Sequence, residues 1–304
     1  PNYPNPLFIQ GGKNMYKLAA IDLDGTMLNQ YGIVTQRTKQ AIERAQQRGI
    51  EVIIASGRPM DSIKAIAEEI KSEKYFISGN GAIIYDIQNN EIIYENTLSK
   101  AKALEIIKIC EENSIYYNVY TEKEIIAKNL QYNVLYYHKE NLTKAEEDKT
   151  HINIVDSIYD YVANIDGKIL KIMICDGHQT IFNAIMRKLK EVDDVEVLEV
   201  AHMSRKIIRQ GTEEIPIEYF YTEISAKNVD KWTALEVLKE KMQISTEEIV
   251  TIGDNMNDKK MIENAGMGIA MGQSTPRVKE VAKYVTGSNN EDGVAKALDM
   301  IAKA

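Results

Sequence analysis

Short apolar segments alternate with segments of helical spacing at the start of the chain. The first kind is apolar at consecutive positions, as in strands that are buried on both faces of a parallel sheet. The second kind places apolar and small residues three and four positions apart, which predicts amphipathic helices. In chain order we predict a strand at 16–22, a helix at 35–48, a strand at 51–55, a helix at 60–70 and a strand at 75–78. This β-α-β-α-β order predicts a parallel sheet with helices on both faces.

The pattern changes after residue 81. Two apolar segments at 82–85 and 91–94 flank the polar turn 86–90, which predicts a hairpin. Beyond it we predict a second α+β unit with a core of its own. Its helices are expected at 98–112 and 178–191, its strands near 115–120, 124–128, 168–175, 195–200 and 217–224, and a polar irregular stretch at 139–150.

The first pattern returns near the C-terminus. Helices are predicted at 230–241, 256–264, 276–282 and 291–303, and strands at 249–252, 267–270 and 283–286. We therefore predict an α/β fold: a doubly wound parallel-sheet core of residues 15–96 and 226–304, with an α+β domain of residues 97–225 inserted in it. Residues 1–14 lack the basic start and apolar core of a signal peptide, and we interpret them as a leader, tag or disordered extension before Met15.

The composition is that of a soluble globular protein, with 44% hydrophobic and 27% charged residues. A net charge of -8 and the lack of any Lys/Arg block argue against nucleic acid or a membrane surface as a partner. No segment approaches the roughly 18 apolar residues that span a bilayer. Cys110 and Cys175 have no C-x-x-C context, which favours buried free thiols in a reducing cytoplasm. We expect a cytoplasmic monomer or homodimer.

Carboxylates gather where predicted strands end. Asp22 and Asp24 follow the first strand, Ser56 follows the second, and Asp254 and Asp258 follow a later one. Ligands of open α/β sheets bind beyond the carboxyl ends of the strands, so we expect these side chains to share one site. Carboxylates without histidine or thiol suit Mg²⁺, which makes one divalent ion the implied cofactor. If the segment after residue 253 is helical, Asp254 and Asp258 share one face of the helix. Each of these motifs taken alone could instead be a turn or a helix cap.

The ordered motifs carry a family resemblance. They are D-L-D-G-T at 22–26, S-G-R at 56–58, N-G-A at 80–82, Lys231 within N-V-D-K-W-T-A-L, and G-D-N-M-N-D at 253–258. With these motifs the chain resembles the haloacid dehalogenase-like phosphatase superfamily, and within it the Cof-type group of sugar phosphatases with a class IIB cap. The resemblance implies a Rossmann-like core and Mg²⁺-dependent hydrolysis of phosphomonoesters of small metabolites such as sugar phosphates. It also implies that the inserted domain is a cap that contributes to substrate specificity.

The resemblance implies a role for each matching residue. Asp22 would attack phosphorus and become an aspartyl-phosphate, while Asp24 would protonate the leaving oxygen and then activate water. Lys231 and Ser56 would hold the transferring phosphoryl oxygens. Further contacts to phosphate or substrate are implied for Gly57, Arg58, Asn80, Gly81 and Asn257. The implied metal ligands are a carboxylate oxygen of Asp22, the backbone carbonyl of Asp24, and Asp254, with Asp258 and Asn257 in support.

Several alternatives stay open. Trp232, the only tryptophan, stands where glycine is common in the group, and it either lies at the phosphate site or, as we favour, packs between core and cap. In the inserted unit, Arg205, Lys206 and Arg209 are candidates for substrate contact, with solvated charges as the alternative. A phosphomutase with a similar cap and a non-catalytic sensor of phosphorylated metabolites are the alternative functions.

Overall fold

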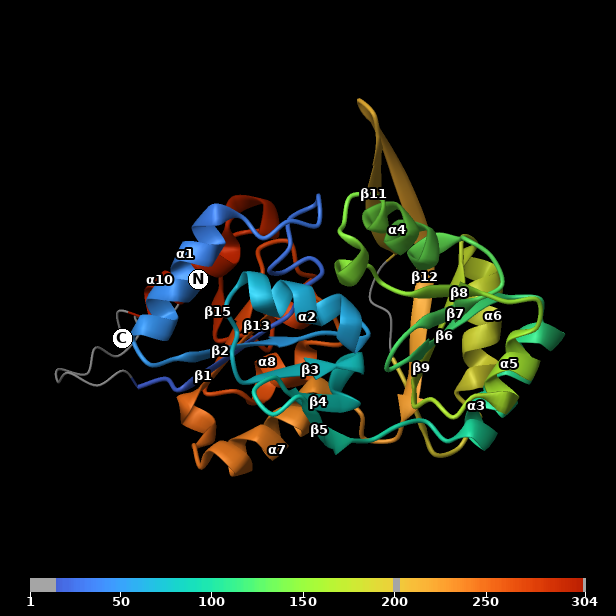
Figure 1. Ribbon diagram of the computed structural model, residues 1–304, viewed down its shortest axis with the longest axis horizontal. Helices are drawn as coiled ribbons and strands as arrows, with labels where there is room; N and C mark the ends of the chain where they lie inside the picture. The colour runs from blue at the N-terminus through green and yellow to red at the C-terminus, as the bar shows by residue number, and fades with distance from the viewer. Residues whose placement is uncertain (1–14, 199–202, 303–304) are drawn as a thin grey trace. The chain divides into compact units, whose positions relative to one another are not determined.

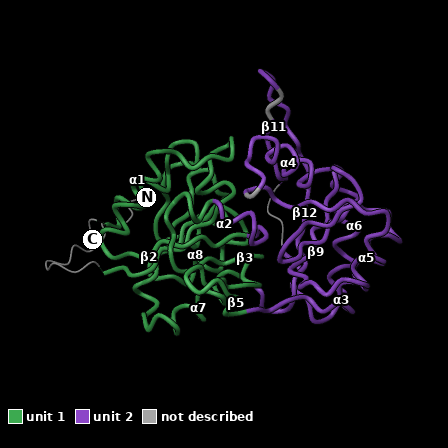
Figure 2. The backbone as a smooth tube through the Cα atoms, viewed as in Figure 1, with its two compact units in different colours: residues 1–56, 66–94, 230–304 green, residues 57–65, 95–229 purple. Residues whose placement is uncertain are grey.

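The computed structural model of the chain describes residues 15–198 and 203–302. These residues form two compact units (Figure 2). Unit 1 takes in the described residues up to Ser56, together with Ile66–Tyr94 and those from Asp230 onward. Unit 2 takes in Gly57–Ala65 and Glu95–Val229. Unit 1 is therefore assembled from segments that lie on both sides of the long unit 2 segment, and the extension proposed for 1–14 lies outside the described residues.

Unit 1 is built on an eight-stranded sheet with β1 near its centre (Figure 1). Its strand order is β15 (Tyr284–Val285), β14 (Met267–Ala270), β13 (Ile249–Gly253), β1 (Leu18–Ile21), β2 (Glu51–Ala55), β3 (Tyr75–Ser78), β4 (Ile83–Asp86) and β5 (Glu91–Glu95). The strands from β15 to β3 run parallel, and β4 pairs with β3 antiparallel. The chain leaves β1 toward β2 and returns on its other side at β13, which makes this pair the topological switch point of the sheet.

Helices cover both faces of this sheet. On one face, α7 (Lys231–Met242), α8 (Lys259–Asn264) and α9 (Pro276–Lys279) share an apolar cluster with side chains of β1, β2 and β13. On the other face, α1 (Gln36–Gln47) packs against α10 (Gly293–Ile301), and α2 (Met60–Glu69) follows β2. Short 3-10 helices lie at Gly79–Gly81, Thr246–Glu248 and Asn289–Glu291. The doubly wound sheet predicted from the sequence is confirmed.

Unit 2 has a mixed sheet with an apolar helical layer on one face. Its strand order is β10 (Val195–Val197), β12 (Glu213–Ala226), β9 (Ile169–Asp176), β6 (Tyr116–Thr121), β7 (Ile125–Ala127) and β8 (Ile152–Ile154), and β11 (Ser204–Gln210) pairs with the first half of β12. The helices α3 (Lys100–Glu112), α5 (Ile158–Asn164) and α6 (Gln179–Leu189) pack on one face in a continuous apolar core. None of the helices in the described parts of the chain is long and apolar enough to cross a membrane.

Unit 2 also contains elements that the sequence pattern did not predict. The helix α4 (Tyr132–Asn141) and the short 3-10 helix at Glu146–Asp148 lie in or beside the stretch 139–150, which was wrongly predicted to be irregular throughout. The hydrophobic pattern also failed to predict the helix α5 and the strands β8 and β11. The sequence of α4, Y-N-V-L-Y-Y-H-K-E-N, is rich in aromatic and other residues of modest helix propensity. Its helical state therefore depends on packing rather than on local preference.

Candidate active site

The carboxyl ends of β1 and β13 bring the first and last carboxylates of the chain together. Ile21 and Ile252 are register partners in these parallel strands, and the N–H of Asp22 continues the ladder by donating to the carbonyl of Ile252 at 3.0 Å. Asp254 is the first residue after β13. Parallel pairing thus places Asp22 and Asp254 at one edge of the sheet, as expected from the sequence.

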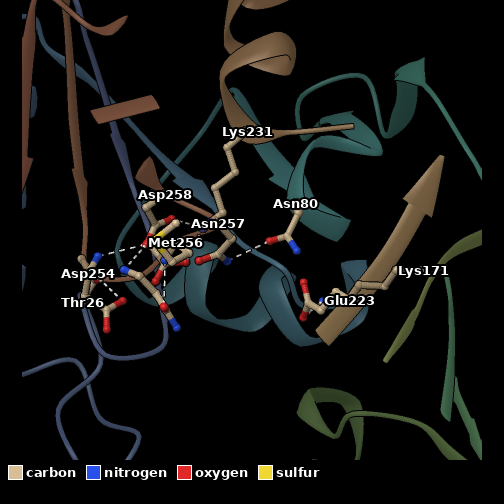
Figure 3. Close-up of polar contacts among 11 residues, drawn as sticks. Thr26, Asn80, Lys171, Glu223, Lys231, Asp254, Met256, Asn257 and Asp258 are labelled. Atoms are coloured by element: carbon tan, nitrogen blue, oxygen red, sulfur yellow. Dashed lines mark hydrogen bonds and ion pairs between the residues drawn. The ribbon is translucent and has the colours of Figure 1, made fainter. Parts of the chain in front are cut away.

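A buried lysine joins two of these carboxylates. Lys231 is the first residue of α7, and its Nζ lies 2.6 Å from Oδ1 of Asp22 and 2.6 Å from Oδ1 of Asp258. The lysine and the Asp258 side chain are fully buried, and only 7% of the Asp22 side chain is exposed. Figure 3 shows the lysine extended from the start of its helix toward these groups. An ammonium so far from water stays charged only because two carboxylates face it.

The loop after β13 wraps around Asp258. The Oδ2 atom of Asp258 accepts the N–H groups of Asp254 at 3.0 Å and Asn255 at 3.1 Å. Gly253 leaves room for this side chain, because an added Cβ would lie 2.5 Å from the Cβ of Asp258. The prediction of a helix from 256 is wrong in its start, since α8 begins at Lys259. The two carboxylates converge through a turn rather than through one helical face.

Three carboxylates form a compact oxygen cluster. One oxygen each from Asp22, Asp254 and Asp258 lies within 4.8 Å of the others. Thr26 donates its hydroxyl to Oδ1 of Asp254 at 3.2 Å. Among the described residues, Asp24 adds no side-chain oxygen to this cluster, and it is more exposed than Asp22. These hard oxygen donors fit Mg²⁺.

Burial sets the protonation of these groups. The pKa of Asp22 is raised to about 7, first by burial and then by Asp258, against the opposing effect of Lys231. Burial also raises the pKa of Asp254 well above its usual range, and Asp22 adds to this effect. Burial alone would lower the pKa of Lys231, but the facing carboxylates of Asp22 and Asp258 raise this pKa above that of an ordinary lysine. A cation in addition to Lys231 would lower the pKa values of Asp22 and Asp254 and favour their ionised forms.

A second group of predicted residues lies beside the cluster. Ser56 follows β2 and is buried, and its carbonyl accepts the N–H of Asn80 at 3.0 Å. Asn257 donates its side-chain amide to Oδ1 of Asn80 at 3.0 Å (Figure 3). Gly81 has φ of +106°, and an added Cβ would overlap the backbone carbonyl of Asp230, which caps α7. These contacts link the segment after β3 to the start of the helix that carries Lys231.

Two residues of the S-G-R motif have different surroundings. Gly57 and Arg58 group with unit 2. The guanidinium of Arg58 is almost fully buried and lies 3.2 and 3.3 Å from the two carboxylate oxygens of Glu140 in α4. The same guanidinium lies over the ring of Tyr137, 5.2 Å from the centroid. The role expected for Arg58 at the phosphate therefore stays a prediction, with Glu140 as its partner in the structure.

The residues left open by the sequence are also placed. Trp232 is 6% exposed and belongs to the apolar cluster of unit 1 with Leu235 and Ile53, so it packs in the core of that unit. Arg205 is well exposed and pairs with Glu218 at 3.3 Å, which agrees with a solvated charge. Lys206 lies over the ring of Tyr136, 4.9 Å from the centroid. The side chain of Arg209 lies outside the described part of the chain.

Two contributors to the site had no role in the sequence-based prediction. Thr26 holds Asp254, and Asp230 caps α7 by accepting the N–H of Thr233 at 2.8 Å. Thr26 could have been identified, because a hydroxyl two residues after a carboxylate at a strand end is a ready hydrogen-bond donor to the next strand's loop. Asp230 also had a signal, since an aspartate directly before a helix is a common cap.

Comparison with known proteins decides the family. A family model described as haloacid dehalogenase-like hydrolase matches residues 19–298, a span that includes every residue of the oxygen cluster. The chain belongs to this family. Its membership confirms that this haloacid dehalogenase-like protein is an enzyme of the hydrolase class.

Individual relatives agree with this assignment. Phosphatase YwpJ of Bacillus subtilis (strain 168) is 29% identical to this hydrolase over 288 residues, which cover 92% of this chain and 97% of the relative. A 5-amino-6-(5-phospho-D-ribitylamino)uracil phosphatase of the same organism, YcsE, is 29% identical over 283 residues, or 93% and 94% of the two chains. A solved sugar phosphatase of subclass IIB of the superfamily is similar in fold, with a TM-score of 0.74 at 22% identity over 95% of this chain and 100% of its own. The resemblance to the haloacid dehalogenase-like superfamily noted from the sequence is confirmed.

Proposed function

We propose that this protein is a Mg²⁺-dependent phosphatase that hydrolyses phosphomonoesters of small metabolites, such as sugar phosphates, through an aspartyl-phosphate on Asp22. The observation that carries the proposal is the buried Lys231 between Asp22 and Asp258, beside Asp254 at the strand ends. A site of this kind has a carboxylate nucleophile, a fixed positive charge and oxygen ligands for a cation within one small volume. Both named relatives are phosphatases, which supports the same reaction class here.

We assign the metal-binding role to residues that the cluster already holds in place. Asp22 and Asp254 would bind Mg²⁺ through side-chain oxygens, and Asp24 through its backbone carbonyl. Both oxygens of Asp258 are engaged, one by Lys231 and the other by two backbone N–H groups, so Asp258 would mainly position the lysine and the loop. When bound, Mg²⁺ supplies charge that keeps Asp22 ionised and neutralises the phosphoryl oxygens.

The reaction then needs two displacements at phosphorus. Lys231 and the Ser56 hydroxyl would hold phosphoryl oxygens while the Asp22 carboxylate attacks phosphorus and the bond to the substrate oxygen breaks. Asp24 would give its proton to that leaving oxygen. In the second displacement, Asp24 would take a proton from water, whose oxygen attacks phosphorus as the bond to Asp22 breaks. Phosphate leaves and both carboxyl groups return to their starting states.

The other site predictions have supporting contacts. Asn257 and Asn80 hold each other by a hydrogen bond, and Gly81 allows the segment to approach α7, so these residues would form the wall of the phosphate site. Gly57 and Arg58 stay proposed contacts to phosphate or substrate, as the S-G-R motif implies. We further propose that residues 97–225, which make up most of unit 2, form the cap that selects the substrate, with residues 15–96 and 226–304 as the catalytic core.

Phosphate release tests this proposal. Wild-type protein with Mg²⁺ should release phosphate from members of a panel of hexose and pentose phosphates, pyridoxal phosphate and FMN, and a chelator should abolish release. Asp22→Asn should abolish release, whereas Asp156→Asn, at an exposed position of unit 2, should leave it unchanged. Unchanged activity in Asp22→Asn would refute the mechanism. Release from single phosphosugars without a bisphosphate activator would exclude a phosphomutase, and any turnover would exclude a sensor without catalysis.

A further inference from the structure

Asp24 lies on the turn 23–28, just beyond the end of β1. The carbonyl of the preceding residue accepts the N–H groups of Thr26 at 3.2 Å and Leu28 at 2.9 Å. Leu28 also forms an isolated β-bridge with Asp24. Gly25, the residue after Asp24, has φ of +78°, a conformation that glycine adopts freely. Because glycine sets few limits on its own backbone, the direction of Asp24 depends on what else holds the turn.

Two amide side chains hold this turn from outside. Gln273, in the loop after β14, donates its side-chain amide to the carbonyl of Gly25. Asn289, in the loop after β15, donates its side-chain amide to the carbonyl of Leu28 at 2.9 Å. The two residues are also joined to each other, because Oε1 of Gln273 accepts the backbone N–H of Asn289 at 3.2 Å. We call Gln273 and Asn289 the amide clamp.

The two loops that carry the amide clamp are fixed against each other. The N–H of Gly272 donates to the carbonyl of Gly287 at 2.9 Å, and a Cβ added to Gly272 would lie 2.9 Å from the carbonyl carbon of Gly287. The side chain of Asn290 adds two bonds to Gln30: its Oδ1 accepts the backbone N–H at 2.9 Å, and its Nδ2 donates to Oε1 at 3.3 Å. All of these residues belong to unit 1. The amide clamp is therefore part of a connected loop pair rather than two independent side chains.

Stability alone gives little reason for the amide clamp. The side chain of Gln273 is exposed and that of Asn289 is half-buried. A hydrogen bond in such a position contributes about 1 kcal/mol or less to folding, because water offers the same partners in the unfolded chain. Orientation matters more for a group that transfers protons. Such a group must lie within about 2.6 to 3.2 Å of the atom with which it exchanges the proton, and a misplacement of about 1 Å can cost about a hundredfold in rate.

We propose that Gln273 and Asn289 are positioning residues for Asp24. By holding the turn, they keep the Asp24 carboxyl group where it can give its proton to the leaving oxygen and later take one from water. They act through the backbone of Gly25 and Leu28 rather than on the substrate. The inference rests on the proposed function, because it explains how the acid/base of that reaction keeps its place although a glycine follows it.

Leaving groups separate this role from a general structural one. At saturating Mg²⁺, kcat/KM is measured for p-nitrophenyl phosphate, whose leaving group needs no proton, and for the alkyl phosphate of the panel that the wild-type protein hydrolyses best, whose leaving oxygen needs one. Gln273→Met and Asn289→Leu should each lower the second value about tenfold and the first by less than about twofold. Gln46→Met is the matched control, because the Gln46 amide also donates to a backbone carbonyl of unit 1, that of Lys71 at 2.9 Å. It should keep the wild-type ratio of the two values.

Hydrogen exchange followed by NMR reports on the turn without catalysis. The N–H groups of Thr26 and Leu28 should exchange about fivefold faster in both clamp variants and at the wild-type rate in Gln46→Met. The inference is overturned if these exchange rates are unchanged, if both kcat/KM values fall equally, or if Gln46→Met changes their ratio as much. Failure of the wild-type protein to release phosphate would instead refute the proposed function, and the exchange rates would still show whether the amide clamp holds the turn.

Discussion

Lys231→Met tests the electrostatic arrangement of the site most severely. Methionine keeps the length and apolar stem of the side chain but removes the charge between Asp22 and Asp258. Breaking a buried pair by removing one partner costs about 3 to 5 kcal/mol, because the remaining charge is left uncompensated. Here two carboxylates at 2.6 Å lose the same partner, so we expect the free energy of unfolding at pH 8 without Mg²⁺ to fall by about 4 kcal/mol.

The pH dependence of this loss follows from Asp22. Its folded-state pKa of about 7 lies above the ordinary 3.8, so proton binding stabilises the folded state and this contribution disappears as the pH rises toward 7. Without Lys231 the pKa should rise further, because the ammonium opposes the shift. At pH 6 the variant can relieve the repulsion by taking up a proton. The loss should therefore be about 1 to 2 kcal/mol smaller at pH 6 than at pH 8.

Urea unfolding at both pH values, with and without Mg²⁺, measures these differences. Lys260→Met is the control, because Lys260 pairs with Asp230 at the same helix start but is 54% exposed, and a surface pair contributes about 1 kcal/mol or less. The reasoning is refuted if Lys231→Met loses no more than Lys260→Met, or if its loss is larger at pH 6 than at pH 8.

Two further predictions concern the metal and the backbone. The rise in melting temperature caused by Mg²⁺ should be larger at pH 8 than at pH 6, because below a pKa of about 7 a proton competes with the metal for Asp22. Scanning calorimetry measures this rise, and an equal rise at pH 6 and pH 8 would contradict the assignment of Asp22 as a metal ligand. Gly81→Ala should destabilise the protein by more than about 2 kcal/mol and slow phosphate release, since its Cβ would overlap the Asp230 carbonyl. Gly49→Ala is the control, because Gly49 has φ of +82° but no atom lies within 4 Å of the added Cβ, so the substitution should cost only about 1 kcal/mol. Equal losses of stability for Gly81→Ala and Gly49→Ala would show that the overlap at Gly81 is relieved without cost.

The sequence predicted those parts of the molecule whose local pattern is strong. Parallel strands such as β1 and β2 are apolar at consecutive positions and end in polar residues, so both the strands and the strand-end carboxylates could be read directly. The convergence of Asp22 and Asp254 followed from the rule that parallel strands end at one edge. That Lys231 belongs to the same site was implied only by the motif around it. Its contacts with Asp22 and Asp258 were not predicted, because nothing in a lysine at a helix start indicates burial.

The parts that were missed depend on contacts between distant segments. The helix α4 is stabilised by tertiary partners such as Asn118 and Tyr219 rather than by its own propensity. The turn around Asp258 depends on three side-chain acceptor contacts that periodicity cannot show, and the predicted helix therefore began too early. The partnership of Arg58 with Glu140 spans 82 positions and has no local signal. Each of these features depends on contacts that form only in the folded chain, so the sequence pattern could not predict it.

The central claim is that Asp22 carries the phosphoryl group and Asp24 moves the protons. Asp24→Asn with p-nitrophenyl phosphate tests it most directly, because this leaving group needs no protonation while the second displacement still needs the proton acceptor. We expect a burst of about one equivalent of nitrophenol per site followed by slow turnover, with mass spectrometry of the acid-quenched protein placing one phosphoryl group on Asp22. Turnover at the wild-type rate without a burst, and with no phosphoryl group on Asp22, would contradict the mechanism.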